Sequence, residues 1–213
     1  MPETDTPRVL VLACGALARE ILDVVAMNRW RHVTLECLPV GLHNRPEQIP
    51  AAVEQRLAAA SQTYDRILVG YADCGTGGLL DPIVDRYGAT RLPGAHCYEF
   101  FATSPRFAEL HEAEIGTLYL TDYLVKHFDR VVWRGLGLDR HPQLLDTYFG
   151  NYTRLVYLSQ RPTPRLVNSA EAAAERLGLR FEHIATSYGD LETSIAEFAA
   201  AADLRLPQLA ESV

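Results

Sequence analysis

Short apolar runs alternate with amphipathic segments along most of the chain. Six of these runs have the length and composition of strands: 8–13, 33–38, 64–74, RVVWRG (130–135), RLVYLSQ (154–160) and FEHIATS (181–187). Helical patterns separate them. A regular alternation of strand and helix favours a parallel sheet with right-handed crossovers. We therefore expect an α/β protein with a Rossmann-like parallel sheet flanked by helices.

The helical patterns leave the domain organisation open. Two short ones lie near 97–112 and 117–128, and a later one over NSAEAAAERLG is expected to be capped by Asn168 or Ser169. No linker rich in Pro, Gly or Ser interrupts the chain. The sequence is therefore consistent with a single α/β domain over 1–213, or with two closely packed lobes, 1–113 and 130–213.

The charge of the chain argues against nucleic acid as a partner. The net charge is −7, Arg outnumbers Lys nineteen to one, and no basic run occurs. Nucleic-acid binding needs clustered cations, so it is not expected. No stretch of about 18 apolar residues that would span a membrane is present. The polar start MPETDTPR does not resemble a signal peptide, which favours a cytoplasmic protein with reduced thiols.

Four cysteines lie in the first half of the chain, and three of them stand near strand ends. Cys14 ends RVLVLAC, Cys74 ends DRILVGYADC and Cys97 falls in PGAHCYEF. The carboxyl ends of parallel strands meet at the edge of an α/β sheet where ligands bind, so these thiols should gather there. Thiolates are soft ligands that suit zinc and iron–sulfur clusters. Cys37 lies inside the apolar run VTLECLPV, and for this residue burial in the core is expected.

The spacing of the cysteines narrows the kind of metal site. They are separated by 23, 37 and 23 residues, and no CxxC pair occurs. This excludes a zinc ribbon or a ferredoxin-type site, whose ligands are close in sequence. Three thiols on separate loops would leave one position open on zinc, or on one iron of a 4Fe-4S cluster, as in catalytic sites. Spacing alone leaves open the alternative that Cys14 and Cys74 are ordinary buried thiols.

A glycine loop, Gly75, Thr76, Gly77 and Gly78, follows Cys74 directly. The N–H groups of such a turn can cradle a phosphate or a carboxylate, which makes these residues candidates for cofactor binding. The loop matches neither GxGxxG nor the P-loop pattern, so the indication of a nucleotide is weak. The alternative is that glycine lets the chain turn tightly beside a bulky site.

Histidines and one carboxylate supply candidate proton carriers. His43 in LHN and His96 beside Cys97 are expected to reach the same edge of the sheet, as ligands or proton carriers. Glu99 is a candidate acid or base; alternatively it interacts with a helix dipole. The aromatic runs YEFF and YFGNY are expected to form pocket walls. No GxSxG or HExxH motif indicates a serine hydrolase or a zinc peptidase.

Seven motifs together resemble a bacterial and archaeal family, domain of unknown function 1638. They are ACGAL, LHNRPE, YADCGTGG, GxHCYEF, YLTDYL, GLGLDRHP and YFGNYTRLVYL, and they run from about residue 8 to about residue 190. The family's cysteine motifs fall on Cys14, Cys74 and Cys97. The resemblance therefore implies that these three residues form the metal or cluster site.

The resemblance also implies a metabolic setting. Members of this family are often encoded near corrinoid-dependent methyltransferases for methylamines and betaines, which implies a place in one-carbon metabolism. The expected function is that of a metal- or iron–sulfur-binding protein acting on a small molecule, as a lyase or a methyltransferase. One alternative is zinc that activates a thiol for methyl transfer. Another is a non-enzymatic accessory protein that binds a corrinoid or its methyltransferase partner, although the chain lacks the DxHxxG pattern of the usual corrinoid-binding domain.

Overall fold

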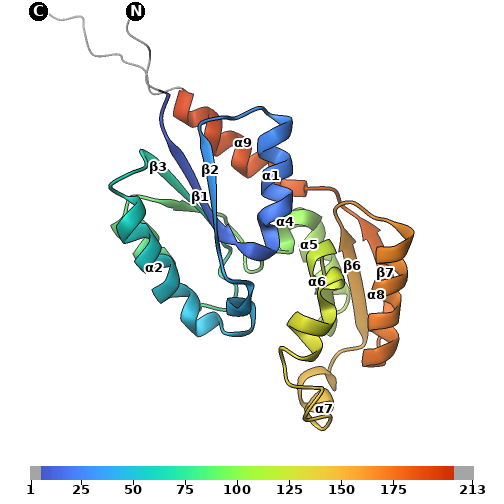
Figure 1. Ribbon diagram of the computed structural model, residues 1–213. Helices are drawn as coiled ribbons and strands as arrows, with labels where there is room; N and C mark the ends of the chain where they lie inside the picture. Colours follow the sequence, from blue (N-terminus) through green and yellow to red (C-terminus); the bar gives the residue numbers. More distant parts are fainter. Residues whose placement is uncertain (1–5, 204–213) are drawn as a thin grey trace, which may run out of the picture.

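Two parallel sheets form the framework of the protein (Figure 1). The computed structural model describes residues 6–203. The first five residues of the polar start MPETDTPR lie outside this range. One sheet has four strands in the order β2-β1-β3-β4, and the other has three in the order β5-β6-β7. The strands are β1 Val9–Cys14, β2 Val33–Leu38, β3 Arg66–Gly70, β4 Thr90–Arg91, β5 Thr117–Leu120, β6 Arg154–Ser159 and β7 Arg180–Ala185. The expected α/β class with parallel strands is confirmed.

Helices connect successive strands and cover both sheets. The α-helices are α1 Ala18–Met27, α2 Ile49–Ala60, α3 Asp81–Arg86, α4 Glu99–Ala102, α5 Ser104–Ala113, α6 Asp122–Lys126, α7 Leu144–Phe149, α8 Pro164–Leu177 and α9 Gly189–Asp203. Short 3₁₀ turns are η1 Gly15–Leu17, η2 Val40–Asn44 and η3 Pro46–Gln48, and η4 Asp129–Trp133 is a π-helix. Within the described part of the chain, no helix is long and apolar enough to cross a membrane.

The four-stranded sheet is the middle layer of the first lobe. Alternate residues of β1 point to opposite faces, because successive side chains of a strand alternate. Val9, Val11 and Ala13 pack with α1, α4 and α9 in one core cluster. Leu10, Leu12 and Cys14 pack with α2 and α3 in another. All six residues of β1 are buried, which explains why its sequence is a continuous apolar run.

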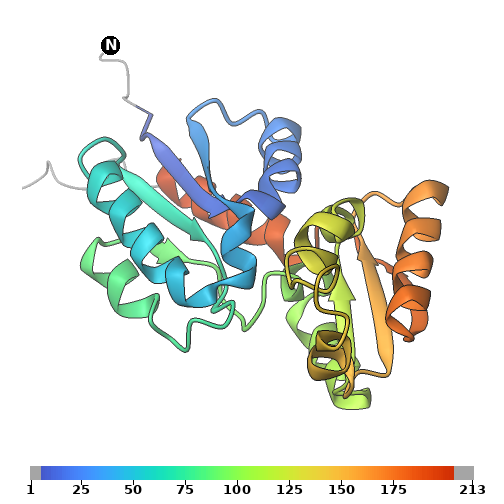
Figure 2. The same cartoon turned by 60° about the horizontal axis from the view of Figure 1, so that its bottom comes forward.

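The three-stranded sheet organises the second lobe in the same way. Leu155 and Tyr157 of β6 face α6, η4, α7 and α8. Val156 and Leu158 face α5 on the opposite side. The last helix, α9, leaves this lobe and packs on the first sheet beside α1 (Figure 2). Helix α5 already packs on the second sheet, so the second lobe begins near Ser104, and the C-terminal helix α9 belongs to the first lobe.

Two predicted elements are wrong in type. The run RVVWRG is the π-helix η4 rather than a strand, and the N–H of Arg134 donates to the carbonyl of Asp129 at 2.8 Å. The helical pattern over 117–128 instead contains β5 followed by α6. Apolar runs this short look the same whether they are buried strands or buried helical turns, so periodicity does not separate them.

The start of α8 also differs from the expectation. Thr163, rather than Asn168 or Ser169, is the N-cap, and its hydroxyl accepts a hydrogen bond from the Leu166 N–H at 3.2 Å. Pro164 takes the first helical position, where a missing N–H costs nothing. Gly178 ends the helix in the left-handed conformation, with φ of 71°.

Arg154 ties the second lobe together from inside. Its side chain is 7% exposed and donates to Glu182 at 2.9 Å, to the Leu110 carbonyl at 3.0 Å and to the Thr117 hydroxyl at 3.1 Å. These contacts join β5, β6, β7 and α5. A buried guanidinium is costly unless its donors are paired, so the whole network is needed.

We expect Arg154→Ala to lower the free energy of unfolding by about 2–3 kcal/mol, because it removes the buried hydrogen bonds to the Leu110 carbonyl and the Thr117 hydroxyl together with the ion pair to Glu182. Urea denaturation followed by circular dichroism measures the loss. Arg106→Ala is the control, since the Arg106–Glu109 pair is exposed and should change stability by less than about 0.5 kcal/mol. A loss below about 1 kcal/mol for Arg154→Ala would contradict the proposed role.

Candidate functional site

A cavity of about 300 Å³ lies at the carboxyl edge of the first sheet, where it meets β5 of the second lobe. Cys14 ends β1, Cys74 follows β3, and Cys97 follows β4. All three line this cavity. Since β1, β3 and β4 are parallel neighbours, their carboxyl ends place the three thiols at one edge.

Cys74 and Cys97 form a close thiol pair, with 2.9 Å between their Sγ atoms. The backbone fixes this approach, because the Asp73 N–H donates to Gly94 at 3.0 Å and the Cys74 N–H to Ala95 at 2.8 Å. The Cys97 thiol donates to Cys74, which lowers the pKa of Cys74 and, together with burial, raises that of Cys97 well above its usual value. Cys74 also has a φ of 51°, a left-handed conformation that is unfavourable for this residue type. The pair therefore contains one thiol poised to ionise.

Cys14 lies deeper, with 5% of its surface exposed. Burial raises the pKa of its thiol, although the Ala16 N–H acts in the opposite direction. It neighbours Tyr71, whose buried hydroxyl interacts with the Cys14 sulfur. Burial and the Cys14 thiol raise the pKa of Tyr71, which keeps the phenol protonated.

Four tyrosines contribute to the cavity wall. Tyr98 and Tyr152 come from the aromatic runs YEFF and YFGNY, and both line the cavity as expected. Tyr71 and Tyr119 also line it, and sequence reasoning missed both. Each has a buried hydroxyl: that of Tyr71 lies beside the Cys14 sulfur, and that of Tyr119 lies beside Thr117 and Arg154. Their sequence signal is a tyrosine at or just beyond the end of an apolar strand, where a polar atom is not needed for packing.

Both predicted histidines, His43 and His96, line the cavity. Burial and repulsion from His96 lower the pKa of His43. Burial also lowers the pKa of His96, whose ring stacks on Tyr98 with 4.9 Å between centroids. Two neutral imidazoles at neutral pH can each coordinate a metal or accept a proton.

Glu99 does not line the cavity. Its carboxylate accepts a hydrogen bond from the Ala95 N–H at 3.0 Å and lies over Gly94, where a Cβ would approach it to 2.9 Å. In this position Glu99 stabilises the turn that carries His96 and Cys97. The structure therefore assigns it a supporting role in the turn, away from the cavity.

The glycine loop binds a carboxylate of the protein itself, that of Asp73. The N–H groups of Gly75, Gly77 and Gly78 and the Thr76 hydroxyl all donate to the carboxylate of Asp73, at 2.6–3.2 Å. These bonds lower the pKa of Asp73. Only Gly75 of this loop reaches the cavity. The cradle that the sequence indicated is thus filled by an internal carboxylate.

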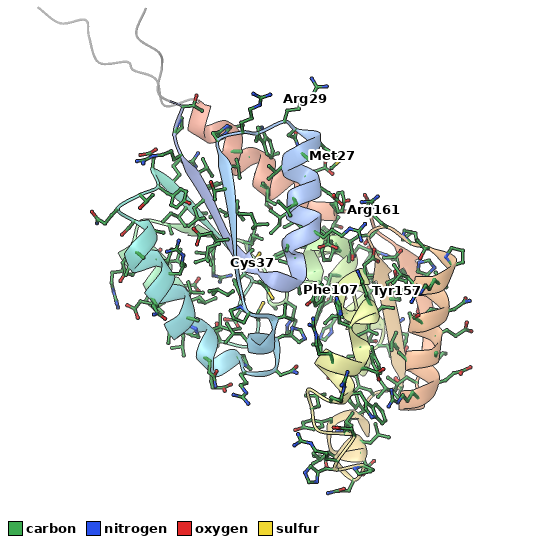
Figure 3. All side chains as sticks on the ribbon, viewed as in Figure 1. Met27, Arg29, Cys37, Phe107, Tyr157 and Arg161 are labelled. Atoms are coloured by element: carbon green, nitrogen blue, oxygen red, sulfur yellow. The ribbon has the colours of Figure 1, made fainter. Side chains whose placement is uncertain are left out.

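Cys37 is exposed, and the expectation that it is buried in the core is wrong. It lies on β2, the edge strand of the first sheet, opposite Ala13 of β1, and it is not among the residues that line the cavity (Figure 3). An edge strand has a neighbour on one side only, and several residues of β2 remain partly exposed. An apolar run alone does not distinguish an edge strand from a central one.

The cysteine and histidine side chains of the cavity are ligand types that suit a soft metal, but Cys74 and Cys97 stand as a hydrogen-bonded thiol pair. Among residues 6–203, no three His, Cys, Asp or Glu side chains already stand at the spacing of a metal site. Two sulfurs that share a zinc ion at about 2.3 Å each lie about 3.8 Å apart, so Cys74 and Cys97 must separate by about 0.9 Å and lose a proton to bind it. Thiolates and neutral imidazoles are nevertheless the ligand types that zinc and iron–sulfur clusters prefer.

Alkylation tests the assignment of the reactive thiol. We expect Cys97→Ala to slow the reaction of Cys74 with iodoacetamide roughly tenfold at neutral pH, because a lost hydrogen bond of about 1.5 kcal/mol to a thiolate lowers its ionised fraction by that factor. Mass spectrometry of the modified peptide measures the rate. Cys37→Ala is the control and should leave the rate unchanged. An equal rate in Cys97→Ala and the unsubstituted protein would show that Cys97 does not activate Cys74.

Comparison with known proteins places the chain in a family. No curated protein and no solved structure matches it. The family described as "Protein of unknown function (DUF1638)" matches residues 37–195, a range that includes His43, Cys74, His96 and Cys97 and begins after Cys14. The match covers well over half of the chain and agrees with the resemblance carried by its motifs. The chain belongs to the DUF1638 family.

Proposed function

We propose that this protein binds a zinc ion or a 4Fe-4S cluster through Cys14, Cys74 and Cys97 and acts on a small molecule at an open coordination position. One observation carries the proposal: three thiols from three separate strand ends line the same cavity as two imidazoles. Unrelated buried cysteines have no reason to converge in this way. The cavity, at about 300 Å³, has the size of the smaller known ligand pockets.

The residues around the thiols have separate roles in this proposal. A bound metal or cluster supplies a Lewis-acidic position. His43 and His96, with lowered pKa values, accept protons from the substrate or from the cysteine thiols when these bind the metal. The buried Tyr71 hydroxyl, beside Cys14, donates a hydrogen bond to an oxygen or nitrogen atom of the substrate. Tyr98 and Tyr152 form apolar walls.

The setting we propose is cytoplasmic and linked to corrinoid-dependent one-carbon metabolism. The family resemblance supports the link to methylamine and betaine methyltransferases, and four free cysteines are compatible with a reducing compartment. Within that setting the reaction is that of a lyase or a methyltransferase. In a non-enzymatic version, the protein is an accessory factor for the corrinoid methyltransferase system.

A zinc-thiolate methyltransferase is the second candidate, and the Cys74–Cys97 pair favours it. Cys74 has a lowered pKa and a partly exposed side chain, as a nucleophilic thiol requires. A zinc ion would keep such a thiolate deprotonated at neutral pH. The two candidates differ in the metal that the cavity holds.

Metal analysis separates the candidates. We expect protein purified without oxygen to contain iron and acid-labile sulfide, with broad visible absorption that Cys74→Ala abolishes because one ligand of the cluster is lost. Zinc without sulfide would favour the zinc-thiolate candidate. Cys37→Ala is the matched control, since Cys37 is exposed and does not line the cavity. Folded protein without metal in any preparation would overturn both candidates.

A further inference from the structure

A second hollow, of about 480 Å³, lies between the two lobes. Its walls come from the amino end of α1, from α6, and from the loop that leads into α8. The amino end of η1 and α1 has no side-chain cap, and its helix dipole favours an anion nearby. We call this hollow the interlobe groove. Gly15 lines the groove and follows Cys14 of the cavity directly, so the two sites are neighbours.

Glu20 is the unusual residue of the interlobe groove. It is 5% exposed, yet its Oε2 atom has no hydrogen-bond partner among residues 6–203. A buried polar atom without a partner is costly, and nearly all such atoms in native proteins are satisfied. A carboxyl group that lines a hollow and lacks a protein partner points to a partner supplied from outside.

Two cations beside Glu20 also lack partners. Arg19 and Lys126 line the groove, are exposed, and form no ion pair within the described part of the chain. Arg161 is already paired with Asp23 at 3.0 Å. The other acidic residue of the groove, Asp122, is occupied: its carboxylate accepts hydrogen bonds from the Tyr157 hydroxyl and from the N–H groups of Gln160 and Arg161 at 2.6–3.1 Å.

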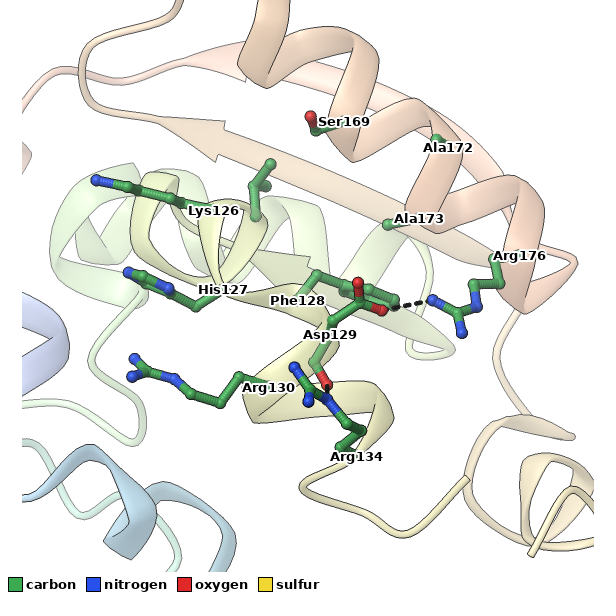
Figure 4. A pocket seen from close by; sticks show the side chains of 11 residues that line it. Lys126, His127, Phe128, Asp129, Arg130, Arg134, Ser169, Ala172, Ala173 and Arg176 are labelled. Carbon is green, nitrogen blue, oxygen red and sulfur yellow. Dashed lines mark hydrogen bonds and ion pairs between the residues drawn. The ribbon is translucent and has the colours of Figure 1, made fainter. Parts of the chain in front are cut away.

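An adjoining hollow of about 560 Å³ adds positive charge on the same side (Figure 4). It shares Lys126 and His127 with the groove and adds Arg130 and Arg134. Its acidic residue, Asp129, is paired with Arg176 at 2.6 Å. Burial and the nearby Arg130 and Lys126 lower the pKa of His127, as expected beside excess positive charge. In a chain of net charge −7, such a local excess attracts anions.

We infer that the interlobe groove binds a small anionic molecule that also carries a hydroxyl or amino group. Arg19 and Lys126 hold the phosphate or carboxylate of this ligand, and the dipole of α1 adds a favourable field. Glu20 accepts a hydrogen bond from its hydroxyl or amino group, which satisfies the partnerless Oε2. This site is distinct from the cysteine cavity and does not depend on a metal there.

Calorimetry with defined probes tests the inference on the full chain. We expect glycerol phosphate or glycerate to bind with a dissociation constant of about 1 mM or tighter. Propyl phosphate, which has the same anionic group without hydroxyls, should bind at least about tenfold more weakly, because Glu20 then stays without a partner. Tighter binding of glycerol phosphate or of glycerate identifies the anionic group as phosphate or carboxylate.

Variants assign the binding to these residues. Arg19→Gln and Lys126→Gln should each weaken binding about tenfold, since each removes a charged contact. Arg31→Gln is the matched control, because Arg31 is an exposed cation outside the groove. The Cys74→Ala variant should keep full binding, which separates this site from the proposed metal site. No binding of any probe at about 10 mM, or an equal loss in Arg31→Gln, would overturn the inference.

Glu20→Leu provides an independent measurement. This variant should bind glycerol phosphate and propyl phosphate equally, because it removes the acceptor that discriminates between them. It should also fold at least as stably at neutral pH. Burial raises the pKa of Glu20. Ionisation of this buried carboxyl therefore lowers the stability of the folded protein as the pH rises above 4.5, the ordinary pKa of glutamate, and the leucine variant does not lose stability in this way. Retained discrimination in a folded Glu20→Leu protein would contradict the role of Glu20.

Discussion

β1 is the element on which both sites depend. It pairs with β2 on one side and with β3 on the other, in parallel register, and every one of its residues is buried. At Gly70 of β3, a Cβ would come within 2.7 Å of the Ala13 Cβ, so this close approach to β1 requires glycine. Such packing fixes the carboxyl end of the strand. Cys14 and Gly15 are therefore held in place between the cavity and the interlobe groove.

Burial sets the charge state of the cavity. The same low-dielectric surroundings raise the pKa of Cys14 and lower the pKa of His43 and His96, so all three are neutral near neutral pH. Cys74 is the exception because Cys97 donates to it. A cavity with one ionisable thiol and two neutral imidazoles can accept a cation only with release of protons. The positive charge that attracts anions lies in the interlobe groove, on Arg19 and Lys126.

The sequence predicted the fold class and the meeting of Cys14, Cys74, Cys97, His43 and His96, since strand ends in a parallel sheet share an edge. What it missed depends on tertiary neighbours. Cys37 is exposed because β2 is an edge strand, and strand order is not visible in the sequence. The Asp73 carboxylate occupies the glycine loop because the loop N–H groups turn toward it. Glu20 lies in an ordinary amphipathic pattern, and its burial follows only from the second lobe packing against α1.

Apolar and polar contacts together join the two lobes. Val40 of η2 packs against the apolar cluster of the second sheet, and Asp23 of α1 accepts a hydrogen bond from Arg161 at 3.0 Å. Asn44 donates to the Val131 carbonyl at 2.7 Å. Polar contacts of this kind resist separation less than an apolar core does. Because the cavity and the groove both take lining residues from the two lobes, a change in lobe separation alters the shape of both.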